Sequence, residues 1–507
     1  MFQNPILKGF HPDPSVCRVG EDYYLVNSTF EYFPGLPVFK SRDLVNWEQI
    51  GYVLDRPDQL KLDGCASSAG LYAPSIRYHD GVFYVVCTNT THGGNFVVTA
   101  TDPAGPWSEP HFLGTPGIDP CLLFDDDGKA YYVGQCGRTP SEYGGDCVIY
   151  VQEFDYKNLC VVGERTIVWD GALKRSFWAE GPRLYKIFDT YYLMIAEGGT
   201  WHNHSVTMAR SKNVLGPYAP CMRNPIVTHR HLGDDYPLVN IGHADLIETQ
   251  TDEWWMVAHG CRQIDGHHCN LGRETVLAHV EWDGDRWPVV NPGFGIFKES
   301  NERMPDLPLT PTPAAPDKET FASECLPLDF MTVRTPRAPF YSLRKPGLRL
   351  QAKAASPDDR DQVSLLCRRV CDRSFSAATM LHRTGGEADG AGLILMQKNT
   401  HYFALSLHEG FVRFTSVIGD KREVVEQPYD GDTVYLSVEG RGQDYSFYFG
   451  ANEGEKRPLI EHVDARGLST ESATSFTGLT VGLFASAYGK DTDAYADFDY
   501  FYYHGND

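Results

Sequence analysis

The sequence predicts an all-β protein in which a five-bladed β-propeller is followed by a C-terminal β-sandwich of the jelly-roll type. A repeated hairpin pattern over the first three hundred residues predicts the propeller, and alternating apolar and polar runs after a proline-rich stretch predict the sandwich. We therefore expect a propeller domain over residues 1–304, a linker over 305–320, and a sandwich over 321–507 that packs on the propeller.

Each repeat reads as a short strand, a polar turn, and a second strand that opens with two aromatic residues, which is typical of a hairpin. The five first strands begin at Asp13-Pro14-Ser15, Ala73-Pro74-Ser75, Asp119-Pro120-Cys121, Glu180-Gly181-Pro182 and His243-Ala244-Asp245. The paired aromatics of the second strands are Tyr23-Tyr24, Phe83-Tyr84, Tyr131-Tyr132, Tyr191-Tyr192 and Trp254-Trp255.

Successive repeats start 46 to 63 residues apart, which is the length of a four-stranded propeller blade. Five repeats predict five blades, and the start of each innermost strand then faces the central axis. Three carboxylic acids (Asp13, Asp119, Glu180) and one histidine (His243) are predicted to meet there, while Ala73 heads the second blade.

The region after Phe297 has a different composition. Prolines are frequent from Pro305 to Pro316, which predicts a semi-rigid linker. Beyond it, alternating runs such as 402–407 and 434–438 are separated by turns such as Asp430-Gly431, as in a sandwich. A free carbohydrate-binding module is the competing interpretation of this region.

Composition and net charge limit the classes of molecule that the protein is expected to bind. The formal net charge of −22 argues against nucleic acid and against an anionic membrane surface. The first residues lack the basic start and apolar run of a secretory signal, and the thirteen cysteines contain no Cys-x-x-Cys pair. We expect a cytoplasmic protein without a required cofactor, whose oligomeric state, a homo-oligomer included, is left open.

Several carboxylic acids buried in one place are costly, because like charges and loss of water both disfavour ionisation. Two carboxyl groups on opposite sides of a bond are the usual equipment of glycoside hydrolysis, one protonated and one ionised. Glu180, beside Phe177 and Trp178, is the better acid, and Asp13, fixed between two prolines, is the better base. On these grounds alone the two roles could be exchanged.

Six motifs occur in an order that resembles glycoside hydrolase family 43, in particular its β-xylosidase and α-L-arabinofuranosidase members. They are residues 10–15 (FHPDPS), 30–35 (FEYFPG), 117–120 (GIDP), 179–182 (AEGP), 242–246 (GHADL) and 271–275 (LGRET). The resemblance implies an inverting mechanism in which Asp13 is the general base, Glu180 the general acid, and Asp119 a group that orients the acid and tunes its pKa.

The resemblance also implies that Arg273 binds substrate and that His243 is an axial histidine, beside one structural calcium ion or ordered water in some members. An ion pair with Glu274 is the alternative role for Arg273, and a purely structural role is the alternative for His243.

Two departures from the family pattern alter the expected wall of the site. Tyr72-Ala73-Pro74-Ser75 stands where many members have Trp-Ala-Pro-Asp, and Ala179 and Arg183 flank the acid motif where Thr and His are common. Phe30, Tyr72 and Trp178 are candidates for stacking on a sugar, with core packing as the alternative.

The function that follows is an exo-acting inverting glycosidase that releases terminal β-D-xylosyl or α-L-arabinofuranosyl residues, or both, from xylan-type oligosaccharides. A non-catalytic sugar-binding propeller and a retaining, fructosidase-like hydrolase are the alternatives. The first conflicts with the presence of all three acids, and the second with Ile118, which stands where a fructosidase has arginine.

Overall fold

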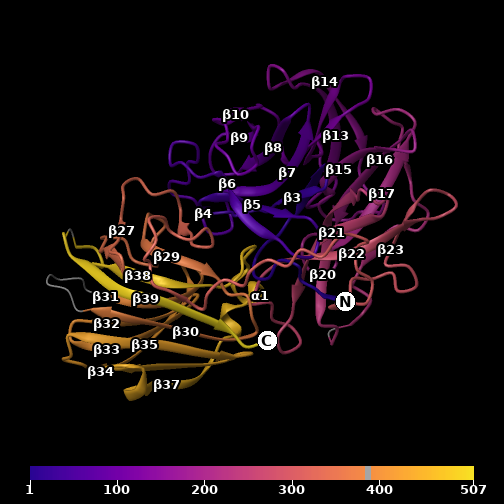
Figure 1. Cartoon of the computed structure of the whole chain (residues 1–507). Helices are drawn as coiled ribbons and strands as arrows, with labels where there is room; N and C mark the ends of the chain where they lie inside the picture. Colours follow the sequence, from indigo (N-terminus) through magenta and orange to yellow (C-terminus); the bar gives the residue numbers. More distant parts are fainter. Residues whose placement is uncertain (234, 383–389, 491) are drawn as a thin grey trace.

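The computed structural model describes residues 1–233, 235–382, 390–490 and 492–507, and it shows two β-domains packed against each other (Figure 1). The N-terminal domain contains five small antiparallel sheets and the C-terminal domain two larger ones. Among the described residues the one α-helix is α1 (Thr470–Ala473), at the junction of the domains. The predicted all-β fold class is confirmed.

Each blade of the propeller is an antiparallel sheet whose strands follow one another in sequence. The blades are β2 (Ser15–Val19), β3 (Asp22–Val26), β5 (Gly35–Ser41) and β6 (Glu48–Leu54); β7 (Leu71–His79), β8 (Val82–Asn89), β9 (Gly94–Ala100) and β10 (His111–Phe112); β11 (Ile118–Phe124), β12 (Ala130–Gly137), β13 (Cys147–Asp155) and β14 (Cys160–Trp169); β15 (Glu180–Ile187), β16 (Thr190–Glu197), β17 (Ser205–Ser211), β18 (Ala219–Pro220) and β19 (Val227–Thr228); and β20 (Leu238–Glu248), β21 (Trp254–Arg262), β22 (Glu274–Trp282) and β23 (Pro288–Val290). Their inner strands adjoin in a closed ring, in the order β2, β7, β11, β15, β20 and back to β2.

The inner hairpins form where the sequence supplies residues that accept a left-handed backbone. Between β7 and β8, Asp80 and Gly81 have φ of 48° and 82°, and His79 pairs directly with Val82. Two consecutive left-handed residues match the twist of the paired strands, so the chain reverses in the tightest possible turn.

The ring is closed by the N-terminal segment. Strand β1 (Phe2–Gln3) pairs with β24 (Ser300–Asn301), and the Asn4 side chain exchanges hydrogen bonds of 2.8–2.9 Å with the backbone of Leu277. Two segments far apart in sequence therefore meet beside the fifth blade, just before the segment that carries Asp13.

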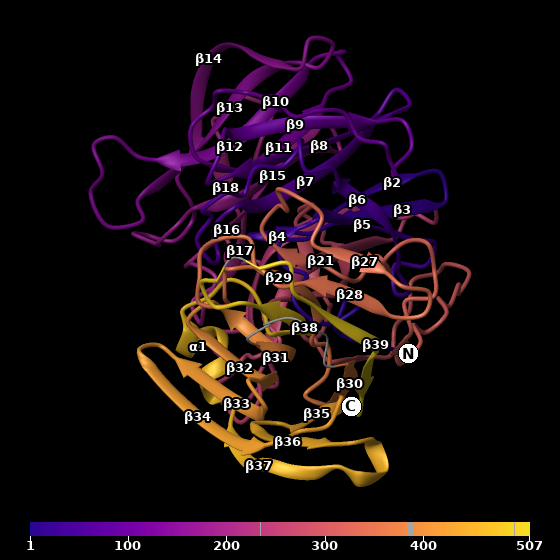
Figure 2. The ribbon, with the colours of Figure 1, turned by 90° about the vertical axis from the view of Figure 1, so that its left-hand side faces the viewer.

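The C-terminal domain is a sandwich of two curved sheets around one apolar core (Figure 2). One sheet contains β25 (Lys318–Glu319), β27 (Tyr341–Leu343), β28 (Leu348–Gln351), β30 (Ser374–His382), β35 (Thr433–Arg441), β36 (Asp444–Gly450), β37 (Arg457–Asp464) and β39 (Tyr495–Gly505). The other contains β29 (Ser364–Arg369), β31 (Gly390–Lys398), β32 (His401–His408), β33 (Phe411–Ile418), β34 (Lys421–Pro428) and β38 (Thr480–Ser486).

The two domains share structure as well as surface. Strand β4 (Tyr32–Phe33) of the propeller pairs with β26 (Thr332–Val333) of the second domain. Phe10 and Tyr32 lie in one buried cluster with apolar side chains of the sandwich, and the proline-rich segment is held to the propeller by a 2.8 Å hydrogen bond from Asp306 N to Glu253 Oε2. The segment just before Asp13 therefore rests on the second domain.

Candidate active site

The three acids predicted at the axis come from three different blades. Asp13 lies two residues before the start of β2, Asp119 is the second residue of β11, and Glu180 is the first residue of β15. The structure brings them together: Asp119 Oδ2 accepts a 3.0 Å hydrogen bond from the backbone N–H of Gly181, next to Glu180, and Asp13 and Asp119 are both buried.

The register of the blades corrects one detail of the predicted repeat. In β7, β11, β15 and β20 a bulge falls on Ala73-Pro74, Asp119-Pro120, Gly181-Pro182 and His243-Ala244 respectively. The residue of the fourth blade that corresponds to Asp119 is therefore Gly181, and Glu180 stands one place earlier. Gly181 has a left-handed φ of 58°, as Asp13, Asp119 and His243 do, and an added Cβ would come within 3.0 Å of the His243 ring, so glycine makes room for the histidine.

Asp13 is held by a dense set of donors. Its Oδ1 lies 2.9 Å from Arg273 Nη1 and 3.0 Å from His259 Nδ1, and its Oδ2 accepts a 2.6 Å hydrogen bond from Ser28 Oγ. The short, mostly charge-assisted contacts fix both the position and the ionised state of this carboxyl group.

Thr200 lies between Arg273 and His259. The Thr200 hydroxyl accepts a 3.2 Å hydrogen bond from Arg273 Nη1 and lies 3.2 Å from His259 Nε2. His259 Nδ1 lies 3.0 Å from Asp13 Oδ1 and 3.2 Å from the backbone N of the same residue, so the ring contacts both the carboxyl group and the backbone of Asp13. Arg273, Thr200 and His259 thus form one network directed at Asp13.

Burial by itself would raise the pKa of Asp13, but the charge of Arg273, the nearby His243 and the hydrogen bond from His259 bring it well below its ordinary value. Burial lowers the pKa of His243 and of His259 to about 3, so both imidazoles are neutral near pH 7. Arg273 is therefore the main positive charge that keeps Asp13 ionised.

The other two acids are shifted in the opposite direction. Burial, and after it the negative charge of Asp13, raises the pKa of Asp119 to about 7. Burial and the charges of Asp119 and Asp13 raise the pKa of Glu180 well above its ordinary value, against a smaller opposing effect of Arg273. One site thus holds a carboxylate and a carboxylic acid at the same pH.

The second domain contributes to the site through the loop between α1 and β38. Phe476 O accepts hydrogen bonds of 3.1 and 3.3 Å from Arg273, and the Arg273 guanidinium lies over the rings of Phe476 and of Phe30. The Phe476 ring also contacts Tyr72, with 6.2 Å between centroids. Phe30 and Tyr72, both predicted to bind substrate, therefore lie around Arg273, together with a residue that the prediction did not include.

Arg273 does not form the ion pair with Glu274 that was the alternative role for it. Glu274, its neighbour in sequence, forms a two-pronged ion pair with Arg262 at 2.7 and 2.8 Å, and Arg273 faces Asp13 instead. Arg273 is also almost fully buried, so its charge acts on the site with little screening by water.

His243 lies at the axis, with Nδ1 3.6 Å from Asp13 Oδ1 and with Nε2 buried and lacking a hydrogen-bond partner among the described residues. Calcium needs six to eight oxygen ligands, whereas His243 offers one nitrogen, and the described residues contain no group of three or more metal-ligating side chains. These residues do not form a calcium site unaided, and the expected calcium ion stays a prediction.

Beyond the acids, charged side chains fill the axis. Asp245 accepts hydrogen bonds from Ser15 Oγ at 2.8 Å, Arg77 Nη1 at 3.1 Å and Tyr185 OH at 2.6 Å, and Arg183 Nε lies 3.5 Å away. Ser15 and Asp245 each follow a blade head by two residues, so this network lies one layer deeper than the acids. It ties together four of the five blades and closes the axis behind the site.

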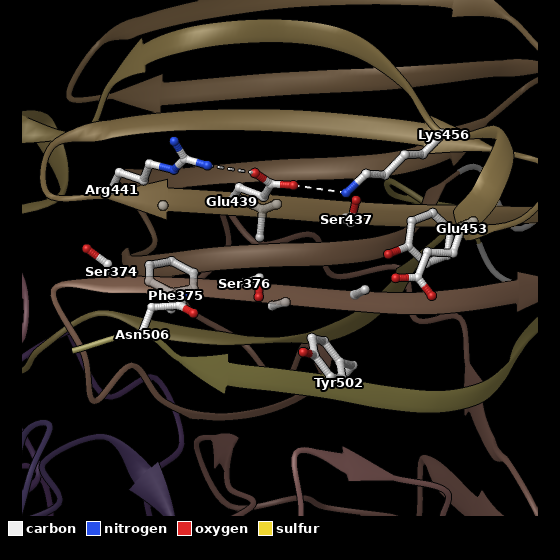
Figure 3. Close-up of a pocket in the computed structure, with 15 residues that line it drawn as sticks. Ser374, Phe375, Ser376, Ser437, Glu439, Arg441, Glu453, Lys456, Tyr502 and Asn506 are labelled. Atoms are coloured by element: carbon white, nitrogen blue, oxygen red, sulfur yellow. Dashed lines mark hydrogen bonds and ion pairs between the residues drawn. The ribbon is translucent and has the colours of Figure 1, made fainter.

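A separate hollow of about 530 Å³ lies on the outer face of the larger sheet of the second domain (Figure 3). Glu439 lies between two cations there, 2.9 Å from Lys456 Nζ and 3.7 Å from Arg441 Nη2. A carboxylate with two cationic partners does not provide the acid and base that stand together at the propeller axis. Among the described residues, no helix has the length and apolar character needed to cross a membrane.

Four residues of the site lay outside the sequence prediction, namely Ser28, Thr200, His259 and Phe476. His259 ends a run of apolar and aromatic residues in β21, and a single histidine in such a run was the one local signal for it. Phe476 gave no signal, because its place in the site depends on how the two domains pack.

A propeller that holds an ionised carboxylate and a protonated carboxylic acid at its axis has the base and the acid that glycosidases use. The comparisons with known proteins agree. The model of glycosyl hydrolases family 43 matches residues 2–288, and that of the β-xylosidase C-terminal concanavalin A-like domain matches residues 318–504. The chain belongs to glycoside hydrolase family 43.

Two curated relatives and one solved structure are similar over nearly their whole length. A xylosidase/arabinosidase of Butyrivibrio fibrisolvens is 43% identical over 98% of both chains, and a non-reducing end α-L-arabinofuranosidase of Bacteroides ovatus is 38% identical over 99% of this chain and 94% of its own. The solved structure of a xylan β-1,4-xylosidase from Bacillus halodurans has a TM-score of 0.93 at 33% identity, covering 99% of this chain and 100% of its own.

Proposed function

We propose that this glycosidase is an exo-acting, inverting enzyme that removes terminal β-D-xylosyl or α-L-arabinofuranosyl residues, or both, from xylan-type oligosaccharides. The observation that carries the proposal is the opposite ionisation of two acids at one axis: Asp13 is kept ionised and Glu180 is kept protonated. The names of the relatives support the choice of sugars, since they include a xylosidase/arabinosidase, an arabinofuranosidase and a xylan 1,3-β-xylosidase.

In this mechanism Glu180 gives its proton to the oxygen of the leaving group as the glycosidic bond breaks. Asp13 takes a proton from the water that attacks the opposite face of the sugar, which inverts the anomeric configuration. Asp119 holds the turn that carries Glu180 through Gly181 N and raises the pKa of Glu180 by its charge. Each proton then has a donor and an acceptor of suitable pKa.

The closed axis favours action at chain ends. Because the Asp245 network fills the axis behind the acids, a sugar can enter from one side only, and a terminal residue fits where the middle of a chain does not. We further propose a cytoplasmic site of action on short oligosaccharides, which the acidic and cysteine-scattered composition supports.

The test is kcat/KM on two aryl glycosides side by side, a β-D-xylopyranoside and an α-L-arabinofuranoside. Turnover of one names the sugar, and comparable turnover of both identifies a dual pentosidase. Absence of turnover on both would contradict the proposal and favour a sugar-binding protein.

A further inference from the structure

Three large aromatic side chains remain partly in water beside the acid. Phe177, Trp178 and Trp201 are 49%, 38% and 42% exposed, while most large aromatic residues of the propeller are buried. A single exposed aromatic needs no explanation, but neighbouring ones on one surface mark a binding site more often than not.

The three rings form one continuous row that begins at the catalytic site. The Trp201 ring is 6.1 Å from the ring of Phe476, Trp178 is 5.9 Å from Trp201, and Phe177 is 5.8 Å from Trp178, all between centroids. Thr200, directly before Trp201, is part of the network around Asp13. The row therefore leads outward from the reacting groups to solvent.

The row is held in place by the backbone. Trp178 N donates a 2.8 Å hydrogen bond to Gly145 O, and Phe177 O accepts one of 2.8 Å from Gly198 N. An added Cβ on Gly145 would lie 3.2–3.4 Å from side-chain atoms of Phe177 and Trp178, so both side chains pack closely on this glycine. Trp178 keeps a left-handed φ of 49°, which is unfavourable for a bulky residue and persists only where its surroundings impose it.

The position of the row identifies what it binds. Phe177 and Trp178 precede Glu180 by three and two residues, and in an inverting glycosidase the proton donor lies on the side of the leaving group. We propose that Phe177, Trp178 and Trp201 bind the leaving-group sugars, with Trp201 and Trp178 under the first and Phe177 under the second, so that the enzyme prefers chains of three or more sugars to disaccharides. The proposal rests on the proposed function.

The chemistry suits a neutral oligosaccharide. The flat faces of pyranose rings carry C–H groups and stack on aromatic rings, whose faces are negative. A row of three neighbouring rings offers such stacking to consecutive sugars, and it makes no demand on the identity of the terminal sugar.

The experiment measures kcat/KM on xylobiose, xylotriose and xylotetraose, together with β-D-xylopyranosyl fluoride, whose leaving group cannot reach the row. For the wild type we expect kcat/KM to rise from xylobiose to xylotriose. Phe177→Ala should abolish most of that rise, because it should lower kcat/KM roughly tenfold on xylotriose and much less on xylobiose. Trp201→Ala should lower kcat/KM on all three oligosaccharides more than on the fluoride.

Phe188→Ala is the matched control, because Phe188 is 42% exposed but follows the far end of β15 from Glu180. It should leave all four substrates unaffected. Phe177→Tyr keeps a stacking ring and should restore the dependence on chain length, which separates loss of stacking from misfolding.

A wild type that hydrolyses the fluoride but shows no rise with chain length would overturn this inference alone. Equal losses of Phe177→Ala on xylobiose and xylotriose would overturn it as well. A wild type that hydrolyses neither the fluoride nor the aryl glycosides of either sugar would overturn the proposed function itself.

Discussion

At the scale of single residues, the site depends on giving opposite ionisation states to acids that are close together. Burial disfavours the charge on each of them, yet Arg273, the nearby His243 and the hydrogen bond with His259 reverse that effect for Asp13, whereas the pKa values of Asp119 and Glu180 stay raised. Among the described residues, the Glu180 carboxyl group has no such set of donors, and only the charge of Arg273 opposes the rise of its pKa, so Glu180 keeps its proton.

Replacement of the acid should show its role through the leaving group. Glu180→Ala should lose about 10²–10⁴-fold in kcat on substrates with poor leaving groups, because those need the proton, and much less on substrates with good ones. A series of aryl glycosides of increasing leaving-group pKa measures this. Equal losses across the series would show that Glu180 is not the proton donor.

Asp119 should control the alkaline side of the pH profile. Asp119→Asn removes a negative charge near Glu180 and keeps an oxygen for Gly181 N, so the Glu180 carboxylate becomes easier to form and its pKa falls. The alkaline limb of kcat/KM against pH should therefore move to lower pH, while the acid limb changes little. A limb that stays in place or moves to higher pH would contradict the assigned role.

At the scale of elements, the paired aromatics and turn residues were enough to predict five hairpin repeats, because each hairpin is encoded locally. The register of the fourth blade was not predictable in this way. Glu180 and Gly181 compete for the same place in the repeat, and only the bulge, stabilised by contacts with Asp119 and His243, shows that Gly181 occupies it.

The same limit applies to the loop that brings Phe476 to Arg273. Gly478 approaches Leu271-Gly272 so closely that an added Cβ would lie 2.2 Å from Leu271 O, which is backbone and cannot turn aside. Two short segments from different domains fit together here because neither carries a side chain at the contact, and sequence patterns within one segment do not report such a fit.

Gly478→Ala should displace this loop and with it the carbonyl that binds Arg273. We expect a loss of roughly 1–3 kcal/mol in stability, as for overpacking of a buried contact, and a clear fall in kcat/KM. Gly284→Ala is the control, since an added Cβ there meets nothing within 4 Å. Thermal unfolding and aryl glycoside kinetics measure both effects, and a Gly478→Ala enzyme with wild-type kinetics would show that the loop does not support the site.

At the scale of the whole molecule, the two domains act as one unit around buried polar groups. Glu31 of the propeller lies at the contact with the sandwich, where its side chain accepts a 2.9 Å hydrogen bond from Ser68 N. Arg334 of the second domain donates a 2.7 Å backbone hydrogen bond to Glu31 O, and its Nη2 lacks a partner among the described residues. Burial raises the pKa of Glu31 to about 7 and lowers that of Arg334, so for each of them loss of water outweighs the opposite charge of the other. The sequence predicted two domains, but not that their contact contains a carboxyl group poised to ionise near neutral pH.

This contact should make stability depend on pH. The folded state binds the Glu31 proton more tightly than the unfolded state, so stability falls as pH rises through the interval between about 4.5 and 7. The penalty at pH 8 is on the order of 3 kcal/mol. Glu31→Gln removes it, so the variant should gain melting temperature over the wild type at pH 8 and little at pH 5. A difference that is the same at both pH values would contradict this account.

The central claim, that Asp13 activates water while Glu180 protonates the leaving group, is tested most directly by the configuration of the first sugar released. Proton NMR of the anomeric signals, recorded before mutarotation during hydrolysis of a β-D-xyloside or an α-L-arabinofuranoside, makes this measurement. The account predicts a first product of inverted configuration, α-D-xylose from the xyloside. A first product of retained configuration would show that a carboxylate attacks the sugar directly and would contradict the mechanism.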